Sequence, residues 1–220
     1  MPFAHAALAR AGIVLAQHGV HLLPKGMPAP LPLRLARWLS LPFALIGWPF
    51  HIGKPKETRI ARAFTSLGPS YIKLGQFLAT RGDLIGPELQ RDLSHLQDRL
   101  PPFSMAEARR AIEDAFGGRL EDHFAEFGPP VAAASIAQVH KAAVIDKSTG
   151  ARRFVAVKIL RPGVERRFQR DIDSYRFAAR LIERVSPPVR RLQPVAVVDN
   201  LEQTTTLEMD LRLEAAAISE

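Results

Sequence analysis

The chain has 220 residues, of which 30 are Lys or Arg and 22 are Asp or Glu, so its formal net charge is +8. A hydrophobic share of 47% and a charged share of 24% are typical of a folded protein and exclude a wholly disordered chain. The lack of cysteine excludes disulfide scaffolds, thiolate metal sites, iron–sulfur clusters and cysteine nucleophiles. The net positive charge favours an anionic binding partner. Since the arginines are scattered and no zinc-finger or aromatic RNA-binding pattern occurs, we expect no nucleic acid partner.

The N-terminal part is apolar and broken by prolines. Residues 1–23 are typical of a mostly apolar helix, without the basic leader of a signal peptide. Residues 38–50 form the most apolar window, but these 13 residues are fewer than the ~20 that a membrane-spanning helix needs. Either this window lies on an anionic membrane surface, with Trp38 and Trp48 at headgroup depth, or it is a connector that packs on the domain behind it.

From Glu57 onward the apolar residues recur at helical spacing, and Gly68-Pro69 separates a first helix from a second. The second helix carries Lys73, Gln76 and Thr80 on a narrow polar stripe beside an apolar one. From periodicity alone, this stripe indicates a solvated surface.

Two more helices are expected before the composition changes. One opens at Gly86-Pro87 and is expected to run to Leu100, where two prolines follow. The other opens at the capping box Ser104-Met-Ala-Glu107, and its Ile112 and Phe116 are expected to point inward.

After Gly128-Pro-Pro130 small and β-branched residues predominate, which predicts a strand over 131–145, a turn and a strand over 154–160. Strand alternation places Lys158 on an otherwise apolar face. A desolvated ammonium needs a partner, so Lys158 should meet a carboxylate or a phosphate. The alternative is a lysine at the exposed end of the strand. The apolar neighbours on its face are Phe154, Ala156 and Leu160.

Val155-Ala-Val-Lys158 matches the Val-Ala-Ile-Lys signature of the third strand of protein kinases. In that strand the lysine holds the nucleotide α- and β-phosphates and pairs with a glutamate from a helix. An amphipathic helix from Phe168 to Ile182 follows the hairpin, which is the element order of a kinase small lobe. The glycine-rich loop is missing, and an alanine-rich loop occupies its place.

Together, five motifs resemble the UbiB family of atypical protein-kinase-like proteins, from about residue 57 to the end. They are Lys73-Leu-Gly-Gln76, Leu96-Gln-Asp-Arg-Leu-Pro-Pro-Phe103, Ala132-Ala-Ala-Ser-Ile-Ala-Gln-Val-His140, Val155-Ala-Val-Lys158 and Arg161-Pro-Gly163. The resemblance implies an α+β fold with a helical N-terminal extension, a kinase-like small lobe and a missing second lobe. The expected domains are an apolar, membrane-facing segment (1–56), a helical Lys-x-Gly-Gln region (57–127) and a truncated small lobe (128–220).

The resemblance also implies a nucleotide site. Lys158 would be the nucleotide lysine, and Lys73 and Gln76 would reach over the pocket. Glu208, in a Glu-x-Asp motif, is the expected partner of Lys158, with Glu214 as the alternative. Because alanine narrows the accessible backbone conformations, the loop should hold phosphate differently from a glycine loop and favour binding over transfer. The residues of that loop would be Ala132, Ala133, Ala134 and Ser135.

The family is associated with ubiquinone biosynthesis, adenine nucleotide and membranes. The resemblance therefore implies ATP as cofactor, and an anionic membrane surface and quinone-pathway proteins or lipids as partners. It implies a peripheral position on the cytoplasmic face of the inner membrane. The sequence has no His-Arg-Asp-like segment, no Asp-Phe-Gly and no magnesium-holding Asn and Asp. We therefore assign no catalytic residue and no metal ligand in this chain, and expect magnesium only with a second lobe.

Three functions remain open at this point. The first is part of an atypical kinase or ATPase-like protein that supports ubiquinone biosynthesis. The second is a nucleotide-gated, non-catalytic lipid-binding or chaperone-like component of the same process. The third is a helical interaction module.

Overall fold

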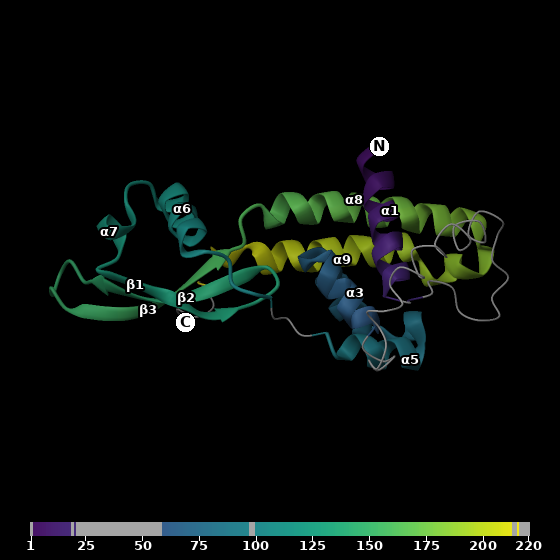
Figure 1. The fold of residues 1–220 in the computed structure, drawn as a ribbon, viewed down its shortest axis with the longest axis horizontal. Coiled ribbons are helices and arrows are strands. Elements are labelled where there is room, and N and C mark those ends of the chain that lie inside the picture. The colour runs from purple at the N-terminus through teal and green to yellow at the C-terminus, as the bar shows by residue number, and fades with distance from the viewer. Residues whose placement is uncertain (1, 19, 21–58, 97–99, 213–214, 216–220) are drawn as a thin grey trace. The chain divides into compact units, whose positions relative to one another are not determined.

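The computed structural model describes residues 2–18, 20, 59–96, 100–212 and 215 (Figure 1). The chain divides into two compact units, one of residues 1–97 with 166–207 and one of residues 98–165 with 208–220. The division into 1–56, 57–127 and 128–220 stays a prediction. The apolar window 38–50 and Glu214 lie outside the described residues.

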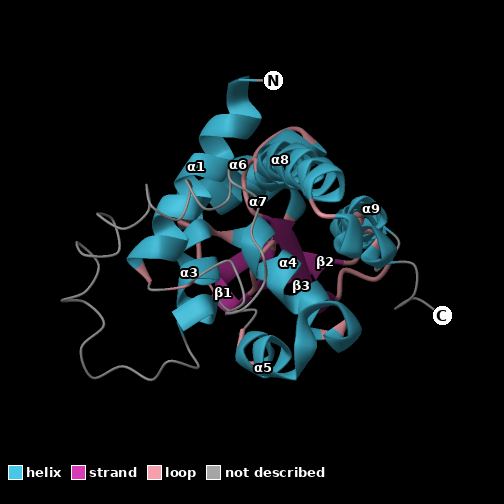
Figure 2. Ribbon diagram, turned by 90° about the vertical axis from the view of Figure 1, so that its right-hand side faces the viewer, coloured by secondary structure: helices cyan, strands magenta, loops and turns pink. Residues whose placement is uncertain are grey.

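The helices of the first unit are α1 (Pro2–Gln17), α3 (Arg59–Leu67), α4 (Pro69–Ala79), α5 (Gly82–Ser94), α8 (Val164–Val185, from Arg166 on), the 3-10 helix η3 (Pro187–Leu192) and α9 (Pro194–Met209, to Leu207). The second unit contains α6 (Met105–Phe116), α7 (Leu120–His123), β1 (Glu126–Ala133), β2 (Ala137–Ile145) and β3 (Arg152–Leu160). Figure 2 distinguishes these helices and strands by colour. The predicted α+β class is confirmed.

Helices α3 and α4 and the segment just after α5 pack closely at a glycine. Gly68 has a φ of 110°, which glycine adopts readily, and Pro69 begins α4 where its missing N–H leaves no bond unmade. A Cβ on Gly75 of α4 would lie 2.2 Å from Leu96 Cδ1 and 2.7 Å from Phe64 Cδ2. The glycine of the Lys-x-Gly-Gln motif is therefore required by packing.

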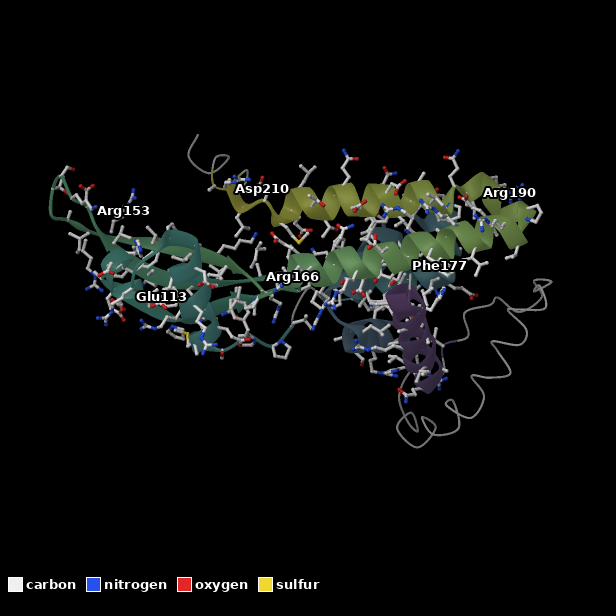
Figure 3. All side chains as sticks on the ribbon, turned by 90° about the horizontal axis from the view of Figure 1, so that it is seen from above. Glu113, Arg153, Arg166, Phe177, Arg190 and Asp210 are labelled. Carbon is white, nitrogen blue, oxygen red and sulfur yellow. The ribbon has the colours of Figure 1, made fainter. Side chains whose placement is uncertain are left out.

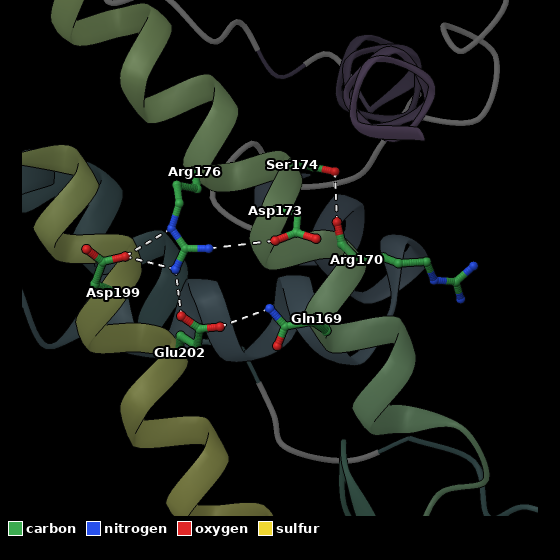
Figure 4. A network of polar contacts seen from close by, with 7 residues as sticks. All are labelled: Gln169, Arg170, Asp173, Ser174, Arg176, Asp199 and Glu202. Carbon is green, nitrogen blue, oxygen red and sulfur yellow. Dashed lines mark hydrogen bonds and ion pairs between the residues drawn. The ribbon is translucent and has the colours of Figure 1, made fainter. Parts of the chain in front are cut away.

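Polar contacts join α8 to α9 in the first unit (Figure 4). Arg176 of α8 donates to Asp199 Oδ1 at 2.9 Å and to Glu202 Oε2 at 2.6 Å, both on α9. Gln169 donates to the other Glu202 oxygen at 3.0 Å. The hydrogen bond from Gln169, opposed by burial and reinforced by Arg176, lowers the pKa of the Glu202 carboxyl. The acid is therefore ionised in the folded chain and holds the two helices together.

One helical prediction of the first unit is confirmed at its start and wrong at its end. The helical backbone of α5 is interrupted at Gly86, so a separate helical stretch begins at Pro87 as expected, but it ends at Ser94 and not at Leu100. Gly86 has a φ of 80° inside α5 and kinks it, because Pro87 disfavours the helical conformation in the residue before it. On α8, Ile182 is 37% exposed, so the apolar stripe of this helix fades towards its end.

In the second unit the described strands form an antiparallel sheet in the order β1-β2-β3. The expectation that strand structure starts after Gly128-Pro-Pro130 is wrong, because β1 begins at Glu126 and contains these residues. An edge strand tolerates proline, since one side of its backbone needs no ladder partner. The β1–β2 register shifts on both sides of Pro130, so the prolines also bend the strand.

Helix α6 begins at the predicted capping box. Ser104 N donates to Glu107 Oε2 at 3.0 Å, and Glu107 N donates to Ser104 Oγ at 3.2 Å. Ile112 is buried as expected. Phe116 is 61% exposed, so its predicted inward position is wrong. It lies in the last turn of α6 and contacts the rings of His123 and Phe124 instead.

One face of the sheet is buried by α6 and α7 (Figure 1). Ile159 of β3 forms a cluster with Ala108 and Ile112 of α6 and Leu120 of α7, and Val157 packs against it. Strand alternation then places Lys158 on the opposite face. Figure 3 shows the side chains of this unit, with Glu113 on α6 and Arg153 towards the β2–β3 turn.

We predict that Gly75→Ala destabilises the protein by about 1–3 kcal/mol, because the added methyl group overpacks the contact with Leu96 and Phe64. The matched control is Gly12→Ala in α1, where a Cβ meets nothing within 4 Å. This control should be neutral or more stable by up to about 1 kcal/mol, since alanine favours helix. Urea denaturation measures both. Equal stability of the two variants would contradict the packing argument.

Candidate functional site

A row of three residues crosses the sheet face opposite α6 and α7. Ala132 of β1 pairs with Val139 of β2, which pairs with Lys158 of β3. Paired residues of antiparallel strands point to the same face, and neighbouring strands lie about 4.8 Å apart. Lys158 and the alanine-rich segment therefore lie on one face, with a small apolar side chain between them.

The surface beside Lys158, towards the β2–β3 turn, combines exposed apolar side chains with cations that contact the Phe154 ring. Phe154 is 56% exposed, Ala156 is exposed, and Lys158 itself is half-buried. Lys141 pairs with Ala156, and its Nζ lies 4.2 Å from the centroid of the Phe154 ring. Lys158 is thus neither fully desolvated nor at a fully exposed strand end. This arrangement offers a cation beside an apolar surface, the combination that a nucleotide with a flat base and charged phosphates requires.

The alanine-rich segment forms the end of β1 and the turn into β2. Ala132 and Ala133 belong to β1, and Ala134 and Ser135 lie in the turn. The Ala134 N–H donates to the Ala137 carbonyl at 2.8 Å, which closes the turn. Ser135 is fully buried. Only Ala134 and Ser135 therefore lie in the hairpin turn, whereas the loop was expected over all four residues, and its contact with phosphates stays a prediction.

A residue that sequence reasoning passed over holds this turn. Arg161, which follows β3, donates from Nε and Nη2 to the Ala134 carbonyl at 3.1 and 2.9 Å. Its Nη2 also donates to the Pro101 carbonyl at 2.9 Å. The Arg-Pro-Gly motif predicts a turn. It does not predict the contact of Arg161 with Ala134, which lies 27 residues earlier in the chain.

A buried polar chain crosses the covered face of the sheet. His140 Nδ1 lies 2.9 Å from the Gly128 carbonyl, which can only accept, so the ring hydrogen lies on Nδ1. His140 Nε2 then accepts from Gln138 Nε2 at 2.8 Å, and Gln138 Oε1 accepts from Phe103 N at 2.9 Å. These side chains satisfy backbone groups that the sheet leaves unpaired. The only signal in the sequence was two polar residues with period 2 in an apolar strand.

The Glu-x-Asp motif lies where α9 ends. Glu208 is exposed in its last turn, and Asp210 follows the helix and accepts from Arg212 Nε at 3.1 Å. Asp210 therefore lies outside the helix that contains Glu208. Met209 packs against the cluster of Ile136, Ala137 and Val164, as Leu160 does. The last turn of α9 and the end of β3 thus share one apolar cluster. The pairing of Glu208 with Lys158 stays a prediction.

Lys73 and Gln76 belong to the first unit, whereas the other candidate residues belong to the second. Lys73 is 8% exposed and Gln76 is half-buried, so the solvated-surface interpretation of their stripe is wrong for Lys73. Tyr71 on the same helix contacts the Tyr175 ring of α8 edge-on at 5.1 Å, and burial raises the pKa of Tyr71 to about 12. Lys73 is thus on a helix that is packed into the unit.

The described residues hold no cluster of three or more histidine, aspartate or glutamate side chains suited to a metal ion. Within the same residues, no helix combines the length and apolar character needed to cross a bilayer.

Comparisons with known proteins agree with these observations. Residues 95–220 match the family described as ABC1 atypical kinase-like domain. Proteins named probable protein kinase UbiB are similar to the chain in Xanthomonas campestris pv. campestris strain B100 (39% identity over 211 residues, 96% of this chain and 37% of the relative) and in Shewanella baltica strain OS155 (40% over 198 residues, 88% and 35%).

The chain spans 37% of the length of the first of these relatives. No solved structure matches it. The family match covers more than half of the chain, and it contains the sheet, the alanine-rich turn and Lys158. The chain therefore belongs to the ABC1 atypical kinase-like family, and the resemblance to UbiB proteins that its motifs predicted is confirmed.

Proposed function

We propose that this chain supplies the nucleotide-binding small lobe of an atypical kinase-like protein, which binds ATP and supports ubiquinone biosynthesis at a membrane surface. The observation that carries the proposal is the row from Ala132 to Lys158 on the sheet face opposite α6 and α7, beside the alanine-rich turn. Lys158 would bind the α- and β-phosphates, and the exposed surface of Ala156 and Phe154 would receive the base. Glu208 would orient Lys158.

The name of the relatives, probable protein kinase UbiB, agrees with this proposal. The ubiquinone role, the membrane partner and the position on the cytoplasmic face of the inner membrane come from the family resemblance. In this proposal the N-terminal window 38–50 provides the membrane contact, and quinone-pathway proteins or lipids are the partners.

A second candidate is a nucleotide-gated, non-catalytic lipid-binding or chaperone-like role. The observation that favours it is the alanine turn, whose Ala134 N–H is already bonded to Ala137 and is therefore not offered to a phosphate. An assay of ATP turnover by the full-length protein distinguishes the two functions. It is carried out with and without anionic vesicles and a quinone-like phenol. Binding without turnover in all conditions would support the second.

We predict that Lys158→Ala weakens ATP binding by the full-length protein at least about tenfold, because a charge-assisted contact to phosphate is lost. ATP-dependent thermal stabilisation should disappear with it. The control is Lys147→Ala, which removes the same charge from the exposed β2–β3 turn and should bind ATP like the wild type. Unchanged stabilisation of the Lys158 variant by ATP would refute the nucleotide site.

Lys73→Ala and Gln76→Ala should change the ratio of ATP to ADP affinity, or the turnover, while the helical circular dichroism is kept. Thr80→Ala, an exposed member of the same stripe, is the matched control and should change neither quantity. If the Lys73 or Gln76 variant unfolds at the temperature of the assay, the stripe is structural and its nucleotide role is wrong.

For the membrane contact, we expect co-sedimentation of the full-length protein with vesicles of phosphatidylglycerol and phosphatidylcholine at low salt. Binding should fall as salt rises, because screening weakens the attraction of basic residues to anionic headgroups. Replacing Trp38 and Trp48 by alanine should reduce it further, since both would lie at headgroup depth. Absence of binding at low salt would favour the connector interpretation of residues 38–50.

A further inference from the structure

Arg161 contacts the alanine-rich turn through both its side chain and its backbone. Its Nε and Nη2 donate to the Ala134 carbonyl, and its backbone N donates to the Ile136 carbonyl at 2.8 Å. The side chain is half-buried. Three donors of one residue therefore hold the carbonyls of the two residues that flank Ser135.

The Arg-Pro-Gly motif explains why Arg161 is fixed in this position. The Val164 N–H donates to the Arg161 carbonyl at 3.0 Å, and Gly163, with a φ of 69°, is the third residue of this turn. Proline second and a positive φ third are the requirements of a type II turn. The turn ends β3 and begins α8 within three residues, so the backbone of Arg161 has little freedom to move away from Ile136.

The same guanidinium joins the turn to the segment that leads into α6. Arg161 Nη2 donates to the Pro101 carbonyl, and its Cζ lies 5.7 Å from the centroid of the Phe103 ring. Phe103 is held from the other side, because its N–H donates to Gln138 of β2. The alanine-rich turn is therefore braced against two elements distant in sequence.

This bracing fixes the backbone of Ala134 without any ligand. Its N–H is bonded to Ala137, and its carbonyl accepts two hydrogen bonds from a positive charge. In glycine-rich loops the backbone N–H groups themselves hold the phosphates, and the loop is free to adapt. Here a preset turn presents a fixed shape, which lowers the ordering entropy lost on binding.

We propose that Arg161 is a positioning residue that presets the alanine-rich turn as a fixed wall beside the phosphates of an adenine nucleotide, which Lys158 would hold. The proposal rests on the proposed nucleotide site. Arg161 acts through the Ala134 carbonyl, with no contact to the nucleotide, so its loss should affect phosphate-bearing ligands and spare the nucleoside.

The test compares the full-length wild type with Arg161→Ala, Arg161→Lys and the control Arg153→Ala, which removes an exposed arginine from the other end of β3. Dissociation constants are measured for ATP, ADP and adenosine. For Arg161→Ala we expect the ATP and ADP constants to rise about tenfold, because charge-assisted bonds that fix the turn are lost. The adenosine constant should change less than about twofold, since the base is held elsewhere. The Arg153 variant should match the wild type.

If Arg161→Ala folds poorly, two other measurements test the proposal: the ATP affinity of Arg161→Lys, and hydrogen exchange of the protein without nucleotide. Lysine keeps the charge but lacks the two-pronged geometry, so its ATP affinity should lie between those of the wild type and Arg161→Ala. In both variants, amides of residues 131–138 should exchange faster than in the wild type, while those of 141–145 should not change.

The outcomes distinguish failure of the proposed function from failure of the role proposed for Arg161. If the wild type does not bind ATP, the proposed function fails and the role of Arg161 fails with it. If the wild type binds ATP and both Arg161 variants bind it equally well, only the role of Arg161 is overturned. The same conclusion holds if ATP and adenosine weaken by equal factors, because that result indicates a general loss of structure.

Discussion

The second unit depends on the burial of one side of its sheet. Ile159 and Val157 of β3 pack under Ile112 of α6 and Leu120 of α7, and this apolar contact fixes which face of every strand points outward. Since side chains alternate along a strand, burial of Ile159 places Lys158 on the outer face. A shift of β3 by one residue would bury the lysine under α6 and expose the isoleucine. The candidate site is therefore a consequence of the core beneath it.

Polar side chains then form hydrogen bonds with backbone groups that the sheet leaves unpaired. Prolines in β1 shift its register, and His140 bonds the Gly128 carbonyl in the bulged stretch. Gln138 bonds the backbone of Phe103, and Arg161 bonds the carbonyls of Pro101 and Ala134. Buried backbone groups left unpaired would cost stability, so these three side chains hold the irregular segments in one conformation.

In the first unit, the residues of the Lys-x-Gly-Gln motif are needed for different reasons. In Lys73-Leu-Gly-Gln76 the glycine is needed because Leu96 and Phe64 pack where a side chain would lie. Lys73 is buried although it is charged, a position in which a lysine is seldom found unless it is paired. Packing thus explains the third residue of the motif, and the nucleotide role of Lys73 and Gln76 stays a prediction. The ion pairs of Arg176 with Asp199 and Glu202 stabilise the helices α8 and α9 of the same unit.

The sequence alone determined the features that depend on neighbours in the chain. The capping box at Ser104, the alternation of β3 around Lys158, the turn at Arg161-Pro-Gly163 and the ordered motifs of the family follow from local backbone preferences and short spacings. Only the tertiary structure decided that β1 runs through Gly128-Pro-Pro130, that Phe116 is exposed, that Lys73 is buried, and that Arg161 bonds Ala134. These depend on edge position in a sheet, on which faces are covered, and on contacts between residues far apart in the chain, none of which a local pattern contains.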